Sequence, residues 1–142
     1  MSESAQWDWS CDLTVPAQPG AGDPLIDRML DRMKRLRWPE KDMFNVQLAF
    51  EEAMTNAIMH GSRSDSRKKV FLQCSVAESE VRISIRDEGI GFNPDTLPDP
   101  RHPDNILTPS GRGILLIRHI MSKVEFLPGG NGLTMIKFRT KA

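Results

Sequence analysis

The stretch from Ala49 to Gly61 constrains the fold more than any other part of the chain, because its composition predicts a helix throughout. It contains no proline and no internal glycine, and most of its residues favour helices. Gly61 stands where a helix commonly ends. We expect this helix to begin at Pro39 and to run to about His60.

Two polar residues, Glu52 and Asn56, share one face of this helix. One residue advances an α-helix by about 100°, so the two side chains are offset by roughly 40°. The helix is otherwise largely apolar, and burying an unpartnered carboxylate costs several kcal/mol. Alone, the pair is more typical of a solvated stripe or a capped helix end than of a site, so its meaning depends on the rest of the sequence.

The order of the predicted elements favours an α+β fold. Residues 7–15 alternate between apolar and polar, as a strand with one buried face does. Asp23 is then predicted to cap a helix that has Pro24 at its first position and ends near Arg37. The remaining predicted elements are a hairpin of strands at 69–77 and 80–87, a helix from Ile114, and strands at about 123–128 and 132–140. This order predicts a two-layer α/β sandwich, in which helices cover one face of a mixed, mostly antiparallel sheet.

Size and charge limit the class of protein. A chain of 142 residues is expected to form a single domain, 1–142, with a loose terminus at about 1–5. Nineteen basic and nineteen acidic residues give no net charge, which argues against direct nucleic-acid binding. A membrane-spanning helix needs an apolar run of about 18 residues, and no run in this sequence approaches that length. Cys11 and Cys74 lack metal-type spacing, and we expect reduced thiols in a cytoplasmic protein.

Two glycine-containing segments follow the central helix. Asp87, Gly89 and Gly91 leave the second strand of the hairpin, where a carboxylate can accept a hydrogen bond from an exocyclic amine and glycines let backbone approach a flat ring. The same pattern is common in plain turns. The segment Ser110-Gly111-Arg112-Gly113 comes directly before the predicted helix at Ile114, and its backbone N–H groups are suited to an anion.

Together and in this order, these features resemble the three nucleotide-binding motifs of the GHKL ATPases, which share the Bergerat fold. Residues 52–61 resemble the first motif of the bacterial anti-sigma-factor serine kinases in particular. The resemblance implies binding of ATP and Mg²⁺, with a lid over the nucleotide at about 93–110. It implies roles for the following residues: Glu52 as catalytic base, Asn56 as ligand of Mg²⁺, Asp87 as reader of adenine, Gly89 and Gly91 beside the adenine, and Ser110, Gly111 and Gly113 around the phosphates.

The sequence departs from the family pattern at two points. Related proteins often have Gly-Thr before the last strand, whereas here Leu133 follows Gly132 and Thr134 comes one residue later. Thr134 is therefore a candidate for the adenine pocket. Arg112, between the two lid glycines, is suited either to a phosphate or to solvent. Five prolines lie between 93 and 109, which predicts a stiffer or differently shaped lid.

The resemblance implies a protein serine/threonine kinase that phosphorylates a STAS-type anti-sigma antagonist and regulates a sigma factor. A homodimer is expected, because family members dimerise through the N-terminal end, where Trp7 and Trp9 offer large apolar side chains. The alternative is a module of the same fold that sequesters partners in response to nucleotide without transferring phosphate. An ATPase module of the gyrase or mismatch-repair type fits less well, because we expect a single domain here and those machines need a further one. A histidine kinase also fits less well, because no helical hairpin with a phosphoacceptor histidine precedes residue 52.

Overall fold

The computed structural model describes residues 7–61, 65–88, 109–128 and 131–141. Their elements, in chain order, are β1 (Trp9–Pro16), α1 (Asp23–Arg35), α2 (Glu40–Asn56), a π-helical turn η1 (Ala57–Gly61), β2 (Lys69–Val76), β3 (Glu80–Asp87), α3 (Pro109–Ile120), β4 (Lys123–Phe126) and β5 (Gly132–Phe138). Each predicted strand and helix is present, with ends that shift by a few residues.

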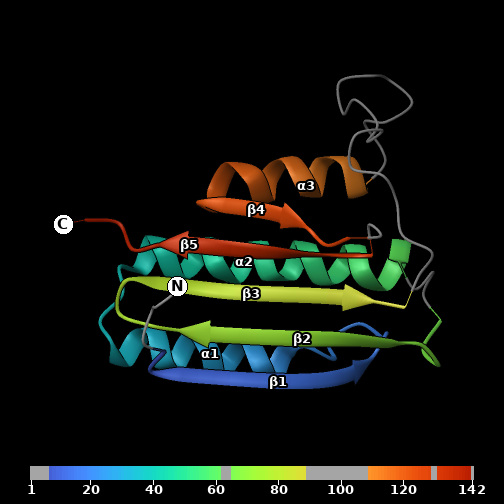
Figure 1. The fold of residues 1–142 in the computed structure, drawn as a ribbon, viewed down its shortest axis with the longest axis horizontal. Coiled ribbons are helices and arrows are strands. Elements are labelled where there is room, and N and C mark those ends of the chain that lie inside the picture. Colours follow the sequence, from blue (N-terminus) through green and yellow to red (C-terminus); the bar gives the residue numbers. More distant parts are fainter. Residues whose placement is uncertain (1–6, 62–64, 89–108, 129–130, 142) are drawn as a thin grey trace.

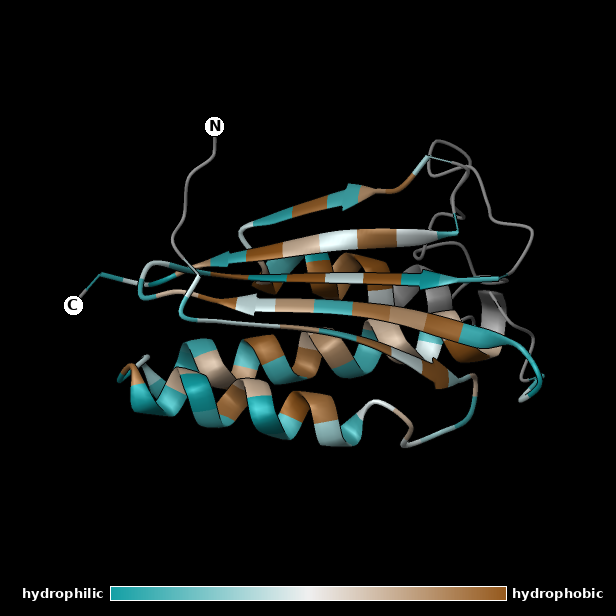
Figure 2. Cartoon of the chain, turned by 60° about the horizontal axis from the view of Figure 1, so that its bottom comes forward, coloured by the Kyte–Doolittle hydropathy of each residue, from teal (hydrophilic) through white to brown (hydrophobic). Residues whose placement is uncertain are grey.

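In the described part of the chain, the strands form one sheet in the order β1-β2-β3-β5-β4, and each neighbouring pair is antiparallel. Helices α1 and α2 pack side by side on one face of this sheet, and no described helix covers the other, open face (Figures 1 and 2). The predicted α+β two-layer sandwich is therefore confirmed. No helix within the described ranges is both long and apolar enough to cross a membrane.

The core lies between the sheet and the helices, where apolar side chains of both layers are buried. Strand alternation sends every second residue of β2 and β3 inward, and helical spacing does the same for one side of α1. Burial of apolar surface contributes about 25 cal/mol per Å². The fully or nearly fully buried residues of these elements are Val70, Leu72, Cys74 and Val76 of β2, Val81, Ile83 and Ile85 of β3, and Leu25, Ile26, Met29 and Met33 of α1.

The start of α1 differs from the prediction, because Gly22 and not Asp23 is the N-cap. The carbonyl of Gly22 accepts hydrogen bonds from the N–H groups of Leu25 and Ile26, both at 3.1 Å. A Cβ atom at Gly22 would lie 2.9 Å from Cζ of Phe50, so this turn presses closely on α2. Asp23 becomes the first helical residue, where its carboxylate interacts favourably with the positive end of the helix dipole.

The C-terminal end of β5 is fastened to the corner between α1 and α2. Arg139 donates from Nη1 to the carbonyl of Leu36 at 3.0 Å and from Nη2 to that of Arg37 at 2.6 Å. Arg37 has a left-handed backbone, with φ of 60°, and follows the end of α1. The guanidinium of Arg139 also lies 5.6 Å from the ring centroid of Trp38.

Asp42 completes this attachment and gives a testable prediction for stability. Its carboxylate is 1% exposed and accepts hydrogen bonds from the backbone N–H of Thr140 at 2.9 Å and from Oγ1 of Thr140 at 2.7 Å. Hydrogen bonds to charged groups contribute about 1.5–3 kcal/mol, so Asp42→Ala should lower the free energy of unfolding in urea by about 2–3 kcal/mol. Asp31→Ala is the matched control, because the ion pair of Asp31 with Arg35 is solvent-exposed and should contribute less than about 1 kcal/mol. Equal losses for the two variants would contradict the attachment.

Candidate functional site

The predicted helix from Pro39 to His60 is present, but its last turn is not α-helical. Helix α2 ends at Asn56, and the turn from Ala57 to Gly61 is a π-helix. Single π-helical turns are rare in proteins, and those that are found lie frequently at functional sites. Ala57 and Ile58 are buried, and this turn packs against β3. Asn56 therefore lies at the junction between the two kinds of helix, in a segment held against the sheet.

The amide of Asn56 is buried, and neither of its polar atoms has a hydrogen-bond partner within the described residues. Each buried polar group left unpaired costs about 1–3 kcal/mol. Native proteins contain few such groups, and each calls for an explanation. A ligand that binds the amide oxygen would supply one, and an amide oxygen is among the ligands that Mg²⁺ accepts.

Gly113 of α3 lies directly against this pair of α2 residues. A Cβ atom at Gly113 would be 3.0 Å from Oε2 of Glu52, 3.3 Å from Nδ2 of Asn56 and 3.6 Å from Oδ1 of Asn56. A side chain here would press on both groups, so the close approach of the two helices requires glycine. The structure thus brings together three of the residues that the sequence predicts for one site.

The prediction that Ser110-Gly111-Arg112-Gly113 precedes a helix is wrong, because α3 begins at Pro109 and includes this segment. Proline suits the first turn of a helix, where its missing N–H costs nothing. The backbone N–H groups of a first helical turn have no partner within the helix, so the predicted suitability for an anion remains. The side chains of residues 109–112 lie outside the described set.

Asp87 ends β3 on the side of the sheet that faces the helices. It is 6% exposed, and it pairs in register with the buried Val70 of β2. Its backbone N–H donates to the carbonyl of Asn131 at 2.8 Å, and Nδ2 of Asn131 donates back to the carbonyl of Asp87 at 3.1 Å. The end of β3 is therefore fixed to the start of β5. Gly89, Gly91 and the predicted lid up to residue 108 lie outside the described residues.

The structure does not bring Thr134 to the side of the sheet that carries Asp87. Thr134 pairs in register with Ser84, and their hydroxyl groups share a hydrogen bond of 2.8 Å on the open face. Successive residues of a strand point to opposite faces, so Leu133 occupies the helix-facing side, where it pairs with Ile85. The sequence shows that Leu133 takes the place of the usual threonine after Gly132. It does not show whether Leu133 or Thr134 faces the helices.

Comparisons with known proteins bear on this geometry. Residues 15–137 match the family of histidine kinase-like ATPase domains. An anti-sigma F factor of Oceanobacillus iheyensis is 30% identical over 108 residues, which span 71% of this chain and 73% of the relative. An anti-sigma F factor of Clostridium perfringens is 31% identical over 105 residues, which span 71% of this chain and 74% of the relative.

One solved structure has a similar fold. It holds the RsbU and RsbW domains of Rv1364c from Mycobacterium tuberculosis, and it matches 94% of this chain with a TM-score of 0.62. The sequences are 17% identical, so the likeness concerns the fold alone. The match spans 34% of that longer protein.

Proposed function

This chain belongs to the histidine kinase-like ATPase family, with anti-sigma F factors among its relatives, and from this premise we propose that it is an ATP-dependent protein serine/threonine kinase. The observation that carries the proposal is the cluster of Glu52, Asn56 and Gly113. It combines a carboxylate, a buried amide without a partner in the described part of the chain, and a helix start that approaches both. This combination suits a nucleotide with its metal ion more than a structural core.

The proposed nucleotide site uses residues of three elements. Asn56 would hold Mg²⁺ through its amide oxygen, and the ion would offset the charge of the ATP phosphates. The free backbone N–H groups in the first turn of α3, at Ser110 and Gly111, would bind the phosphates, and Gly113 would let this helix start approach Asn56. Asp87 would accept a hydrogen bond from the adenine amine, with Gly89 and Gly91 beside the ring. Arg112 stays a candidate for a phosphate contact.

Glu52 is the proposed catalytic base. Its Oε2 lies 3.0 Å from the position that a Cβ atom of Gly113 would take, so the carboxylate adjoins the start of α3 where the phosphates would bind. There it would take the proton from an incoming serine or threonine hydroxyl as the hydroxyl oxygen attacks the γ-phosphorus. Phosphoryl transfer depends mainly on positioning and electrostatics, and a general base contributes typically about 10²–10⁴-fold to a rate.

The proposed acceptor is a STAS-type antagonist protein, and the proposed regulated partner is a sigma factor. The names of the relatives support a role in sigma-factor regulation. A homodimer is proposed as well, because β1 is an edge strand and edge strands carry unpaired backbone groups that another chain can cover. Sedimentation that shows only a monomer at tens of micromolar would contradict the dimer.

A transfer assay tests the proposed activity. The purified chain is incubated with Mg-ATP labelled on the γ-phosphate and with each STAS-domain protein encoded in the same genome. We expect label on one serine or threonine of a cognate antagonist, mapped by mass spectrometry, and no label when EDTA is present. Tight ATP binding without transfer to any of these proteins would overturn the kinase proposal and favour sequestration without turnover.

A further inference from the structure

The two cysteines of the chain lie directly opposite each other on neighbouring strands. Cys11 of β1 and Cys74 of β2 are partners in the antiparallel register, and both are free thiols. Residues that are paired across antiparallel strands share a face and have Cα atoms about 4.5–5.5 Å apart. A disulfide needs a Cα separation of about 4.4–6.8 Å, so the backbone already holds the pair within bonding range.

The two thiols have different environments. Cys11 is half-buried, and Nη1 of Arg28 lies 3.8 Å from its sulfur. Cys74 is fully buried, and this burial, together with the nearby Cys11 and Asp12, raises the pKa of its thiol to about 12. Since the thiolate is the reactive form, Cys74 is a poor starting point for chemistry at neutral pH. A reaction of this pair must therefore begin at Cys11.

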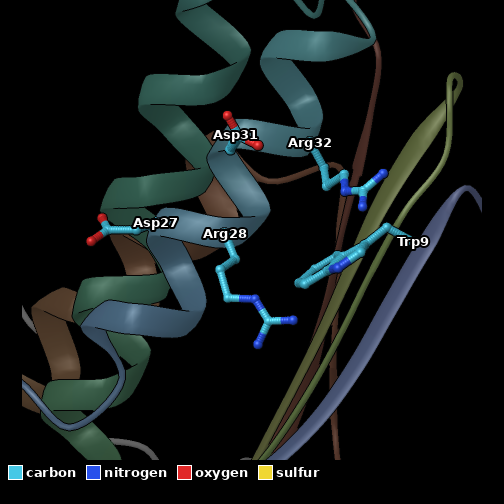
Figure 3. Close-up of a pocket in the computed structure, with 5 residues that line it drawn as sticks. All are labelled: Trp9, Asp27, Arg28, Asp31 and Arg32. Atoms are coloured by element: carbon cyan, nitrogen blue, oxygen red, sulfur yellow. The ribbon is translucent and has the colours of Figure 1, made fainter.

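A hollow lined by Trp9, Asp27, Arg28, Asp31 and Arg32 adjoins Cys11 through Arg28, which also contacts the sulfur. The hollow has a volume of about 300 Å³ and lies between α1 and the edge of the sheet. Arg28 and Arg32 extend from α1 toward Trp9, whereas the carboxylate of Asp27 points to the other side of the helix (Figure 3). The guanidinium carbon of Arg28 lies 5.7 Å from the ring centroid of Trp9, and the same group contacts Cys11. An oxidant that enters the hollow thus meets the guanidinium of Arg28, which lies next to the sulfur.

We infer that Cys11 and Cys74 are an oxidisable pair, which a hydroperoxide converts to a cross-strand disulfide. In the first step the sulfur of Cys11 attacks the hydroperoxide, the O–O bond breaks, and the products are a sulfenic acid and an alcohol or water. In the second step the sulfur of Cys74 attacks that of Cys11, the S–O bond breaks, and the hydroxyl leaves as water with the thiol proton. Two thiols are oxidised by two electrons, and one hydroperoxide is reduced.

The disulfide would act as a reversible lock on the edge of the sheet. Among the described strands β1 pairs with β2 alone, because it is the first strand in the order. The covalent link closes a loop that contains both α1 and α2, and closure of a long loop restricts the unfolded chain. Exposed or strained disulfides are the more easily reduced ones, and Cys11 is partly exposed, so thiol reductants should reopen the pair.

Thiol counting on the full chain tests the inference. After treatment with hydrogen peroxide and removal of the excess, we expect the loss of both free thiols, a Cys11–Cys74 linked peptide and a monomeric chain in denaturing gels without reductant. The oxidised protein should unfold at a temperature several degrees higher, and dithiothreitol should restore the original value. A chain that keeps the Cys74 thiol while Cys11 is over-oxidised, or that links only between chains, would overturn the inference. If the linked chain unfolded at a lower temperature, the disulfide would not stabilise the edge of the sheet, and that part of the inference would be overturned.

Single variants separate the two steps. Cys74→Ser should stop the reaction at the sulfenic acid of Cys11, which a 1,3-dione reagent traps, whereas Cys11→Ser should leave Cys74 unreacted. Arg28→Gln should slow the loss of the Cys11 thiol several-fold. Arg32→Gln is the matched control, because Arg32 lines the same hollow whereas Arg28 supplies the contact to the sulfur, so its effect should be smaller. Equal rates for wild type and Arg28→Gln would overturn the role of the guanidinium, and reaction of Cys74 in Cys11→Ser would overturn the order of steps.

Discussion

Replacing Glu52 with glutamine is expected to slow phosphoryl transfer by orders of magnitude while ATP binding is retained. Glutamine keeps the size of the side chain and its fit against Gly113, where Oε2 of Glu52 lies 3.0 Å from the position that a Cβ atom would take. It removes the capacity to accept a proton from the attacking hydroxyl. The transfer rate should fall by about 10²–10⁴-fold, as expected for loss of a general base. Single-turnover transfer from labelled Mg-ATP measures the rate, and equilibrium titration measures ATP affinity.

Glu51→Gln is the matched control for this variant. Glu51 precedes Glu52 on the same helix, so its substitution changes the net charge of α2 equally. Its side chain is exposed, and its contact is a long hydrogen bond of 3.4 Å from Nε2 of Gln47. The control should transfer phosphate at close to the wild-type rate. If Glu52→Gln also transferred at that rate, Glu52 would not be the base, and if its ATP affinity collapsed, Glu52 would serve binding instead.

The layered fold could be predicted because the patterns that define it are local. Val81, Ile83 and Ile85 alternate with polar residues, and this alternation alone fixes which face of β3 is buried. The strand order could not be predicted, since β5 lies between β3 and β4 although it comes last in the chain. That arrangement depends on contacts between segments distant in sequence, which no local pattern reports.

The errors at the ends of elements have tertiary causes. Gly113 reads as a helix breaker in sequence, yet it lies within α3, because its missing side chain lets α3 approach Glu52 and Asn56. The packing gain offsets the cost of a helical glycine, which is about 1 kcal/mol relative to alanine. In the same way, Gly22 takes the cap position expected for Asp23, because the turn lies against Phe50.

Much of the candidate site could be found from the sequence, although the geometry that links its parts could not. Helical spacing alone put Glu52 and Asn56 on one face, but only the structure shows that the amide of Asn56 is buried and unpaired within the described residues and that Gly113 lies against it. Thr134 shows the limit of such reasoning. A shift of one residue in a strand changes the face, and the pairing of Thr134 with Ser84 puts its hydroxyl on the open side.

Replacing Asn56 with leucine should stabilise the free protein and destroy its response to nucleotide. Leucine is close to asparagine in shape and has no polar atoms, so the cost of the unpaired amide disappears, and the free energy of unfolding in urea should rise by about 1–2 kcal/mol without nucleotide. Wild type should gain about 2.7 kcal/mol at a concentration of Mg-ATP one hundred times its dissociation constant, and the variant should gain nothing.

The opposite signs of these two effects make Asn56→Leu a strict test of why the amide is buried. A residue kept for packing would lose stability when replaced, whereas a residue kept for a ligand gives up stability in the free protein and recovers it on binding. Asn45→Leu is the matched control, because it makes the same substitution on a partly exposed position of α2. The control should keep the full response to Mg-ATP. A destabilised Asn56→Leu protein that still gains stability from Mg-ATP would show that the amide serves the fold and that the nucleotide binds elsewhere.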